Sequence, residues 1–222
     1  MYEVRCRHGA VSSGSLYMKN CTLYSHPVKP IILQRSFYNR SPAIVARELL
    51  GKLLLHRMSG RRLIGRILET EAYGGEDDPA SHAYRGISPF NQILFGPPGF
   101  SDIYLIYGIH YCLNVSCLPA GEAGGVLIRA LAPIEGRDVM VRLRGLPIGS
   151  TDKQLMGGPG RLSKAMGITR KADHGIDVTQ PSSRLQFADD GYRVHDILVS
   201  SRVGIKKGTD RPLRFQARQS EG

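Results

Sequence analysis

The sequence predicts a single α+β domain with a mostly antiparallel β-sheet. Its length, 222 residues, suits one large domain that can bury a sizeable core without disulfides. Segments patterned like strands follow one another along the chain, and helical segments lie between them without the strict alternation of a parallel sheet. No internal repeat divides the chain.

The first 32 residues are expected to lie outside this domain, which would span residues 33–222. They are rich in Ser, Gly, His and Tyr and follow no clear hydrophobic period. We therefore expect a flexible N-terminal extension. A basic arm of this kind could also contact phosphates, and the sequence leaves that open.

The first clear element of the domain is a helix that begins at Pro42 and stops before Gly51. Ser41 suits the position before a helix, Pro42 suits its first turn, and Gly51 suits its end. Apolar residues between them, among them Val45 and Leu49, recur with the helical period.

Strands dominate the rest of the domain. A turn at Ser59-Gly60 separates the first two, and a tight turn around Gly108 joins the next two. The expected strands span residues 52–58, 63–73, 103–107, 111–116, 126–131, 185–187, 192–194, 197–205 and 213–217. The further expected helices span residues 135–144 and 160–166.

The chain is strongly basic, with a net charge of +11 and an isoelectric point near 9.8. Such a balance favours a polyanionic partner, most often a nucleic acid and less often an anionic membrane surface. A generally basic protein without a polyanionic partner is the competing interpretation, and charge alone does not decide between the two.

No apolar run approaches the roughly 20 residues that a membrane-spanning helix needs, and the polar, basic N-terminus holds no signal-peptide core. We therefore expect an intracellular protein with no membrane partner. The four cysteines are not spaced as zinc ligands, so we expect no metal and free thiols. Cys112 lies in an apolar strand pattern and is expected in the core.

Two carboxylates stand on one expected strand, in the run ILETEAY at residues 67–73. Alternate residues of a strand share a face, so Glu69, Glu71 and Tyr73 should point the same way. Burying carboxylates beside an aromatic ring is costly, and one of them could serve as a general base. Spacing alone favours the simpler interpretation that both pair with arginines on a solvated face.

An apolar tip distinguishes the hairpin expected around Gly108. Hairpin tips are usually built from Asn, Asp and Gly, whereas this one carries Tyr107, Ile109 and His110. On a basic protein such a tip could push between base steps in the minor groove of DNA. Aromatic rings could also hold a base taken out of the duplex. The candidates for this sandwich are Tyr73, His82 and Tyr104. Tyrosines in strands more often fill the core.

Several blocks of sequence carry a resemblance to a known family. They include GRILETEAY at residues 65–73, SHAYRG at 81–86 and YLIYGIHYCLNV at 104–115. The other blocks occupy residues 46–51, 95–99, 126–130, 158–162 and 202–205. In this order they resemble the alkyladenine, or 3-methyladenine, DNA glycosylase family, and the resemblance runs from about Leu33 to Ala217.

The resemblance implies a role for the matched residues around the reacting bond. Glu71, the second glutamate of its block, would be the general base, and Glu69 would be structural. Arg129 and a backbone carbonyl near Val203 would help to hold the attacking water. These assignments go beyond what the spacing of the two glutamates alone supports.

The resemblance also implies a binding pocket for the base. Tyr73, His82 and Tyr104 would stack on the flipped base and hydrogen-bond it. Asn114 would lie on the pocket floor and disfavour the exocyclic amino group of normal guanine. Tyr107 would fill the gap that the flipped base leaves in the duplex.

The activity implied is that of a monofunctional DNA glycosylase of base excision repair. It would flip alkylated or deaminated purines (3-methyladenine, 7-methylguanine, ethenoadenine, hypoxanthine) and hydrolyse the N-glycosidic bond with a Glu-activated water, leaving an abasic site. The expected partner is double-stranded DNA with a damaged purine, and a monomer without cofactor is expected. The fold implied is a curved, mostly antiparallel sheet with surrounding helices and a protruding β-hairpin that enters the minor groove.

The chemistry agrees with these assignments. Breaking the bond passes through an oxocarbenium-like state, and a nearby carboxylate stabilises its positive charge while it deprotonates water. An alkylated purine that is already cationic leaves easily, and cationic bases stack favourably on electron-rich rings.

Two segments depart from the usual pattern of the family. After the block that contains His82, the family commonly has a basic residue and then T-P-R-N, whereas this chain has ISPFN, so Ile87 and Phe90 stand where cations are expected. Before the hairpin the pattern is close to H-L-Y-V-Y, whereas Asp102 here replaces an aromatic residue. These departures bear on DNA affinity and on the shape of the pocket.

Other functions stay open at this point. A protein that binds lesions without cleaving would need neither Glu71 nor Arg129. A lyase would need a lysine that forms a Schiff base, and the matched pocket blocks contain none.

A glycine-rich turn and an acidic pair suggest two further alternatives. The turn at residues 157–160 faintly resembles a helix-hairpin-helix phosphate loop, which would imply a catalytic aspartate such as Asp173 or Asp177, although such turns are common as plain structure. Asp77 and Asp78 with His82 could bind a metal, although loop capping is the simpler role for both aspartates.

Overall fold

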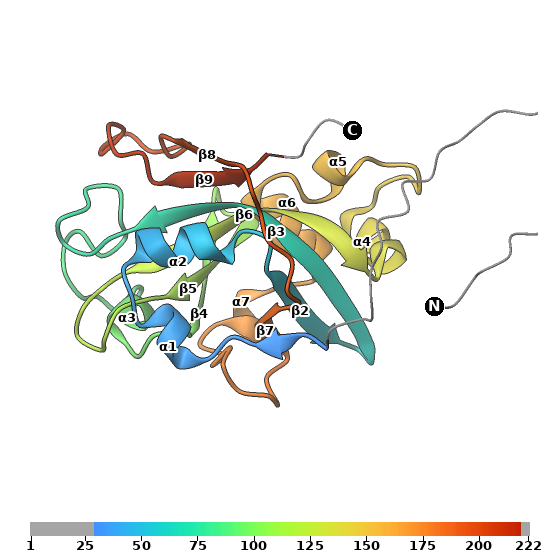
Figure 1. The fold of residues 1–222 in the computed structure, drawn as a ribbon, viewed down its shortest axis with the longest axis horizontal. Helices are drawn as coiled ribbons and strands as arrows, with labels where there is room; N and C mark the ends of the chain where they lie inside the picture. Colours follow the sequence, from blue (N-terminus) through green and yellow to red (C-terminus); the bar gives the residue numbers. More distant parts are fainter. Residues whose placement is uncertain (1–28, 219–222) are drawn as a thin grey trace, which may run out of the picture.

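The computed structural model describes residues 29–218. Residues 1–28 of the predicted N-terminal extension lie outside that range. Its centre is a curled antiparallel sheet with helices packed around it (Figure 1). All pairs between the described strands are antiparallel. The structure therefore confirms the predicted α+β fold with its mostly antiparallel sheet.

The strands form one continuous sheet. In spatial order they are β1 (Ile31–Ile32), β7 (Leu185–Asp189), β2 (Leu53–Met58), β3 (Arg61–Tyr73), β6 (Gly125–Glu135), β5 (His110–Ser116) and β4 (Ser101–Ile106). A further pair lies at the top of Figure 1 and consists of β8 (Ile197–Ser200) and β9 (Arg214–Ala217). The sheet thus joins the two ends of the described chain to its middle.

Strand β3 is shared between several partners. One edge pairs with β6, whereas the other edge pairs with β2 along its first half and with β9 opposite Glu69 and Glu71. The register with β6 shifts on both sides of Glu69. The Thr70 hydroxyl donates to the carbonyl of Ala46, in the helix at residues 42–49, at 2.8 Å. Because side chains alternate along a strand, Glu69 and Glu71 face away from that helix.

Three helices account for most of the helical packing. Helix α2 (Pro42–Leu49) packs on β3 and β6, with its start and end where the sequence predicts them. Helix α4 (Arg137–Arg144) begins two residues later than expected because β6 runs through Glu135. Gly136 then turns the chain with φ of 81°, which glycine adopts easily. Helix α6 (Pro159–Ala165) packs on β5 and β6.

Four short helices escape sequence-based prediction. They are α1 (Arg35–Tyr38), α3 (Gln92–Phe95), α5 (Asp152–Met156) and α7 (Arg170–Asp173). Each is too short to display a helical hydrophobic period. Helix α5 does carry a readable signal, because Thr151 and Gln154 form a capping box at its start.

One expected strand is wrong, and another is shorter than expected. Residues 192–194 form no strand, and Tyr192 instead lies against the guanidinium of Arg66, 4.2 Å from the ring centre. The strand expected at 197–205 ends at Ser200. Beyond it the side chain of Arg202 turns into the protein, and Gly204 has φ of 80°, so the extended conformation cannot continue.

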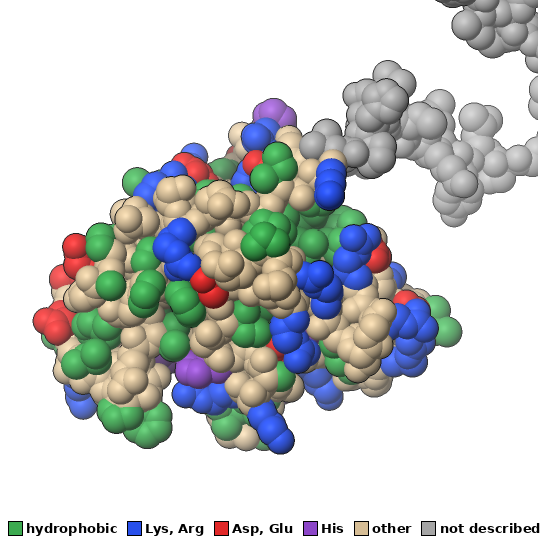
Figure 2. All heavy atoms as spheres, turned by 90° about the horizontal axis from the view of Figure 1, so that it is seen from below, with side chains coloured by type: hydrophobic (Ala, Val, Ile, Leu, Met, Phe, Trp, Pro, Cys, Tyr) green, Lys and Arg blue, Asp and Glu red, His purple; other side chains and the backbone are tan. Residues whose placement is uncertain are grey.

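Charge is unevenly distributed over the surface. On the face drawn in Figure 2, Lys and Arg side chains are densest toward the right, and several Asp and Glu side chains lie at the left edge, with others scattered among the cations. Among residues 29–218, no helix combines the length and apolar character that crossing a bilayer requires.

The ion pair between Lys52 and Asp189 ties β2 to β7, and it should make folding sensitive to acid. Burial opposes ionisation of Asp189, but the Lys52 ammonium, the Gly191 amide and Arg193 outweigh it and lower its pKa to about 2. A lowered folded-state pKa means that the stabilisation is present above pH ~4 and is lost as the pH falls toward 2. We expect Asp189→Asn to reduce the free energy of unfolding by about 1 kcal/mol at pH 7.

Urea denaturation between pH 7 and pH 2 measures this effect. The difference between wild type and Asp189→Asn should shrink as the pH approaches 2. The control is Asp196→Asn, because the pair of Asp196 with Arg218 is exposed and loose at 3.5 Å. A difference that stays constant across this pH range would contradict the assignment.

Candidate functional site

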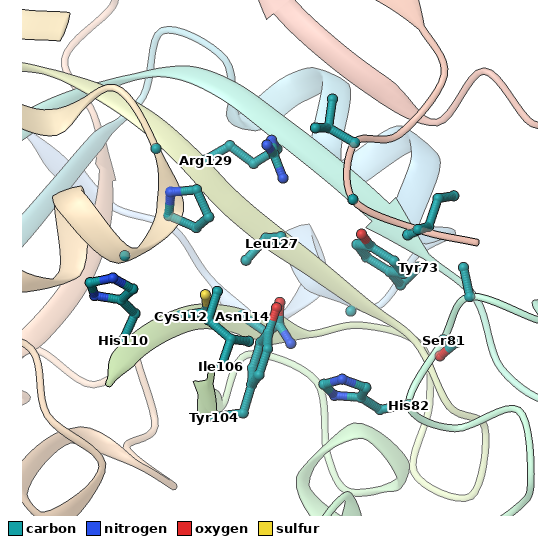
Figure 3. A pocket seen from close by; sticks show the side chains of 18 of the residues that line it. Tyr73, Ser81, His82, Tyr104, Ile106, His110, Cys112, Asn114, Leu127 and Arg129 are labelled. Carbon is teal, nitrogen blue, oxygen red and sulfur yellow. The ribbon is translucent and has the colours of Figure 1, made fainter. Parts of the chain in front are cut away.

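A cavity of about 850 Å³ opens between the sheet, the hairpin β4–β5 and the loop that follows β8. Figure 3 shows Tyr73 and Arg129 on one side of it and Tyr104, His82 and Asn114 on the other. The structure brings together at this cavity seven of the residues that the sequence singles out. These residues are Tyr73, His82, Tyr104, Tyr107, Asn114, Arg129 and Val203.

Glu71 lies directly behind the wall of this cavity. Its side chain is 0% exposed, and its two oxygens accept three hydrogen bonds. The Tyr73 hydroxyl at 2.8 Å and an Arg129 nitrogen at 3.1 Å donate to Oε2, and the backbone amide of Val203 donates to Oε1 at 2.7 Å. The carboxylate is therefore buried but fully partnered.

Arg129 connects the two glutamates of β3. Its Nε donates to Glu69 at 2.7 Å, and the Nη1 atom donates to Glu71. Burial opposes ionisation of Glu69, but hydrogen bonds from Arg214 and Arg129 outweigh it and hold the pKa of Glu69 below its usual range. Glu69 is thus the partner of two arginines, which agrees with the structural role implied for it.

The backbone at Val203 contacts Glu71. The Val203 N–H donates to Glu71 at 2.7 Å, and Val203 itself lines the cavity. The carbonyl that the resemblance implies near Val203 would contact the attacking water and not Glu71, so that role stays a prediction.

A buried ion pair positions the Val203 loop, and sequence reasoning missed it. Arg202 and Asp78 are both fully buried and meet at 2.5 and 2.8 Å. Arg202 also donates to the carbonyl of Ala72 at 3.0 Å and lies over the ring of Tyr73, 4.6 Å from its centre. This pair holds the loop after β8 against the end of β3.

The structure confirms the loop-capping role that the sequence favours for Asp78. Its carboxylate accepts from the backbone amides of Gly74 at 2.9 Å and Ala80 at 3.2 Å. Burial opposes its ionisation, but Arg202 and these amides lower the pKa of Asp78. Among the residues that the structure describes, no three His, Cys, Asp or Glu side chains are grouped to hold a metal.

The aromatic residues of the cavity do not form a parallel sandwich here. The rings of His82 and Tyr104 meet edge to face, with centres 4.7 Å apart and an interplanar angle of 87°. Burial raises the pKa of the Tyr73 and Tyr104 hydroxyls far above their usual range. Both tyrosines therefore stay neutral, and the proton of the Tyr73 hydroxyl is the one that it donates to Glu71.

The side-chain amide of Asn91 holds the loop that carries His82. Asn91 donates to the carbonyls of His82 at 2.9 Å and Gly86 at 3.0 Å. Ile87 and Phe90, which stand where the family has cations, are exposed beside it. The loop is thus anchored from within, and its outer surface is apolar.

Asn114 and Asp102 face each other across strands β5 and β4. The Asn114 amide donates to Asp102 at 3.2 Å. Asn114 lines the cavity, so the acidic departure from the family pattern lies directly beneath its floor. The neighbouring Cys112 also lines the cavity, and burial raises its pKa to about 11, which agrees with the core role expected for it.

Tyr107 stands at the tip of the β4–β5 hairpin with 85% of its surface exposed. Tyr107 and Gly108 both have positive φ, 51° and 71°, as a type I′ turn requires, and the Ile109 amide closes the turn onto Ile106 at 3.2 Å. A tyrosine with positive φ is strained. The strain presents a large ring to solvent where a small residue would fit more easily.

Cationic side chains form part of the lining of the cavity. The lining residues include Arg144, Arg161, Lys206 and Lys207. None of these is among the site residues that the sequence predicts, because they come from segments far apart in the chain. Lys206 and Lys207 follow directly after the matched block at residues 202–205, so the absence of lysine from the matched blocks does not extend to the whole lining of the cavity.

The helix-hairpin-helix alternative does not fit the structure. Gly158 and Gly160 line the cavity, but neither aspartate proposed for that chemistry is free to act there. Asp173 is fully buried and pairs with His56 at 3.0 Å. Asp177 accepts from Arg35 and Thr179.

Comparison with known proteins places these features in a family. A family model described as methylpurine-DNA glycosylase matches residues 36–221. A relative from Koribacter versatilis, named "Putative 3-methyladenine DNA glycosylase", is 50% identical over 183 residues, which cover 82% of this chain and 88% of the relative. Relatives with the same name from Carboxydothermus hydrogenoformans and Methanocella arvoryzae are 42% and 43% identical, over 86% and 85% of this chain and 97% and 94% of theirs.

The Arg202–Asp78 pair should contribute strongly to stability. Asp78→Asn leaves the Arg202 charge buried without its counter-charge, so we expect the free energy of unfolding to fall by about 3 kcal/mol. Urea denaturation at pH 7 measures it. The matched control is Asp77→Asn, because Asp77 is exposed and pairs loosely with Arg211 at 3.4 Å; it should change stability by less than about 0.5 kcal/mol. Equal effects of the two substitutions would contradict this account.

Proposed function

The chain belongs to the methylpurine-DNA glycosylase family, and from this premise we propose that it removes alkylated and deaminated purines from duplex DNA. The substrates would include 3-methyladenine, 7-methylguanine, ethenoadenine and hypoxanthine. Membership of the family makes the protein a DNA glycosylase. The range of lesions and the roles of individual residues are our proposal.

The observation that carries the proposed chemistry is the placement of Glu71 beside Arg129 at the wall of the cavity. Glu71 is buried, fully partnered and separated from the cavity only by groups that bind it, namely the Tyr73 hydroxyl, Arg129 and the Val203 amide. A cavity of about 850 Å³ is within the range of small-molecule sites. A purine seated in it would bring its sugar toward this carboxylate.

In the proposed reaction a water molecule attacks C1′ of the flipped nucleotide. Its oxygen forms a bond to C1′, the bond from C1′ to the purine nitrogen breaks with its electron pair going to the base, and Glu71 takes the proton of the water. The carboxylate also stabilises the positive charge that develops on the sugar. Since Glu71 is closed off in the free protein, the Tyr73 hydroxyl or the Val203 amide would give way as water and sugar enter.

The aromatic residues would capture the base. Tyr104 and His82 meet edge to face, and opening this contact would create room for a purine facing Tyr73. A cationic methylated purine would stack favourably on these electron-rich rings. Damaged bases also cost less to take out of the duplex, which adds to selectivity.

Tyr107 would enter the duplex in place of the flipped base. Its ring stands out from the hairpin on a strained turn, and apolar wedges of this kind are used to part base steps in the minor groove. The cations that line the cavity, among them Arg144, Arg161 and Lys206, would contact phosphates. Binding should then weaken steeply as salt rises.

A single chain supplies every group in this mechanism. We therefore propose that the protein works as a monomer, on cellular DNA and without a cofactor. The apolar surface at Ile87 and Phe90 would lower the contribution of that loop to phosphate binding. The lysines and arginines that line the cavity would supply the affinity instead.

Replacing the proposed base should abolish cleavage without abolishing binding. We expect Glu71→Gln to slow single-turnover release of methylated purines by roughly 10²- to 10⁴-fold, because the amide cannot accept the proton of the water. The matched control is Glu69→Gln on the same strand, which binds Arg129 but does not contact the water; its rate should stay within about tenfold of wild type. The readout is free base by mass spectrometry, together with lesion binding by gel shift.

A rate for Glu69→Gln as low as that for Glu71→Gln would contradict the assignment of the base. Release of base at the wild-type rate by Glu71→Gln would contradict it as well.

Truncating the exposed ring at the hairpin tip should weaken base flipping. We expect Tyr107→Ala to lower the affinity for lesion-containing duplex by roughly tenfold or more, because nothing then fills the gap in the stack. The control substitution is Ile148→Ala, which removes an equally exposed apolar side chain from the α4–α5 loop. Fluorescence of a 2-aminopurine placed beside the lesion measures flipping. Unchanged fluorescence and affinity in Tyr107→Ala would contradict the wedge.

A further inference from the structure

A buried carboxylate lies beneath the floor of the cavity, and the mechanism above does not use it. Asp102 of β4 has 2% of its surface exposed and pairs in register with Asn114 of β5. Figure 3 shows Asn114 beside Tyr104, on the side of the cavity away from Arg129. Asp102 is therefore one side chain away from any base that enters.

This carboxylate is incompletely partnered. Oδ2 accepts from the Asn114 amide at 3.2 Å, whereas Oδ1 is buried and has no hydrogen-bond partner among residues 29–218. Nδ1 of His174 lies 3.5 Å from Oδ1. That nitrogen already accepts from the backbone amide of Ile103 at 3.0 Å, so it has no proton to offer Asp102.

Side chains of other elements face Asp102, among them the guanidinium of Arg170. Arg170 and His174 belong to helix α7 and its end, and His82 comes from the loop before α3. Burial nevertheless outweighs them and raises the pKa of Asp102 above its usual range. A raised folded-state pKa means that ionised Asp102 opposes folding at neutral pH. A buried charge that lowers stability calls for a functional explanation.

Asp102 fixes the direction of the Asn114 amide. An ionised carboxylate can only accept hydrogen bonds, so the Asn114 nitrogen must point to it. The amide oxygen then points away from Asp102, toward the cavity that Asn114 lines. The floor of the cavity consequently presents an acceptor, backed by a negative charge.

On these observations, and resting on the proposed function, we propose that Asp102 is a specificity-determining positioning residue. It turns the Asn114 oxygen toward the bound base and gives the cavity floor a negative potential. The site consequently prefers cationic alkylated purines over neutral damaged purines. Asp102 acts through Asn114 and through its field, without touching the base.

The test compares one cationic and one neutral lesion. Duplexes carry a single 7-methylguanine or a single hypoxanthine, and single-turnover release is measured for both at the same pH. The ratio of the two rates cancels effects that are common to both substrates. We expect Asp102→Asn to lower the ratio of 7-methylguanine to hypoxanthine release by roughly tenfold, the effect of a unit charge about 10 Å away at an effective dielectric constant near 20.

Two comparisons separate this effect from structural damage. Asp190→Asn removes a carboxylate that pairs with Arg66 at 2.7 Å, and neither residue lines the cavity. This substitution should leave the ratio unchanged. Asp102→Asn should unfold at the same temperature as wild type or higher, because it removes a charge that opposes folding. Asp102→Ser serves as a second variant if Asp102→Asn does not fold.

The dependence of this ratio on pH gives a second test. Protonation of Asp102 removes the negative charge, so the ratio for wild type should fall as the pH is lowered, and it should fall less in Asp102→Asn. The raised pKa places this fall above the pH at which an exposed aspartate titrates. Parallel pH profiles for wild type and Asp102→Asn would overturn the proposal.

An unchanged ratio in a folded Asp102→Asn or Asp102→Ser would likewise overturn it. Failure of wild type to release either base would instead reject the proposed function. In that case the affinities of wild type and Asp102→Asn for the two lesion duplexes decide the inference. A lowered preference for the methylated duplex in Asp102→Asn supports it, and an unchanged preference overturns it.

Discussion

The site depends on keeping a fully buried carboxylate satisfied. Glu71 sits inside the sheet, and its hydrogen bonds come from its own strand, from β6 and from the loop after β8. Burying this group without donors would cost several kcal/mol. The long shared strand β3, the register shifts around Glu69 and the Arg202–Asp78 pair together bring those donors into place. The architecture is therefore organised around one acidic group that faces a cavity.

Much of this arrangement is readable in the sequence, and the rest fails for identifiable reasons. Strand alternation places Glu69 and Glu71 on one face, and the matched blocks name the residues that meet at the cavity. The Arg202–Asp78 pair joins positions 124 residues apart, so no local pattern reveals it. The same holds for Lys206 and Lys207, which lie in an irregular loop. The unusual tip of the hairpin is recognisable in the sequence, because Tyr107 stands next to Gly108 where a turn usually has a small or polar residue.

The departures from the family pattern have different consequences in the structure. Ile87 and Phe90 lie on the outer surface of an anchored loop and change only what the protein shows to solvent. Asp102 points inward and reaches the cavity through Asn114. A charge on the surface is screened by water and salt, whereas a buried charge acts over a longer range. The acidic departure is therefore the one that we propose as a determinant of which base the cavity accepts.

The central claim is that water, held at Glu71, breaks the glycosidic bond. Lys206 and Lys207 line the same cavity, and an attacking amine would give a different product. Incubating the wild-type protein with methylated duplex DNA in the presence of sodium borohydride separates the two chemistries. The account predicts release of free purine, a strand that stays intact until alkali is added, and no covalent complex of protein and DNA. A complex trapped by borohydride, or a strand nicked without alkali, would contradict it.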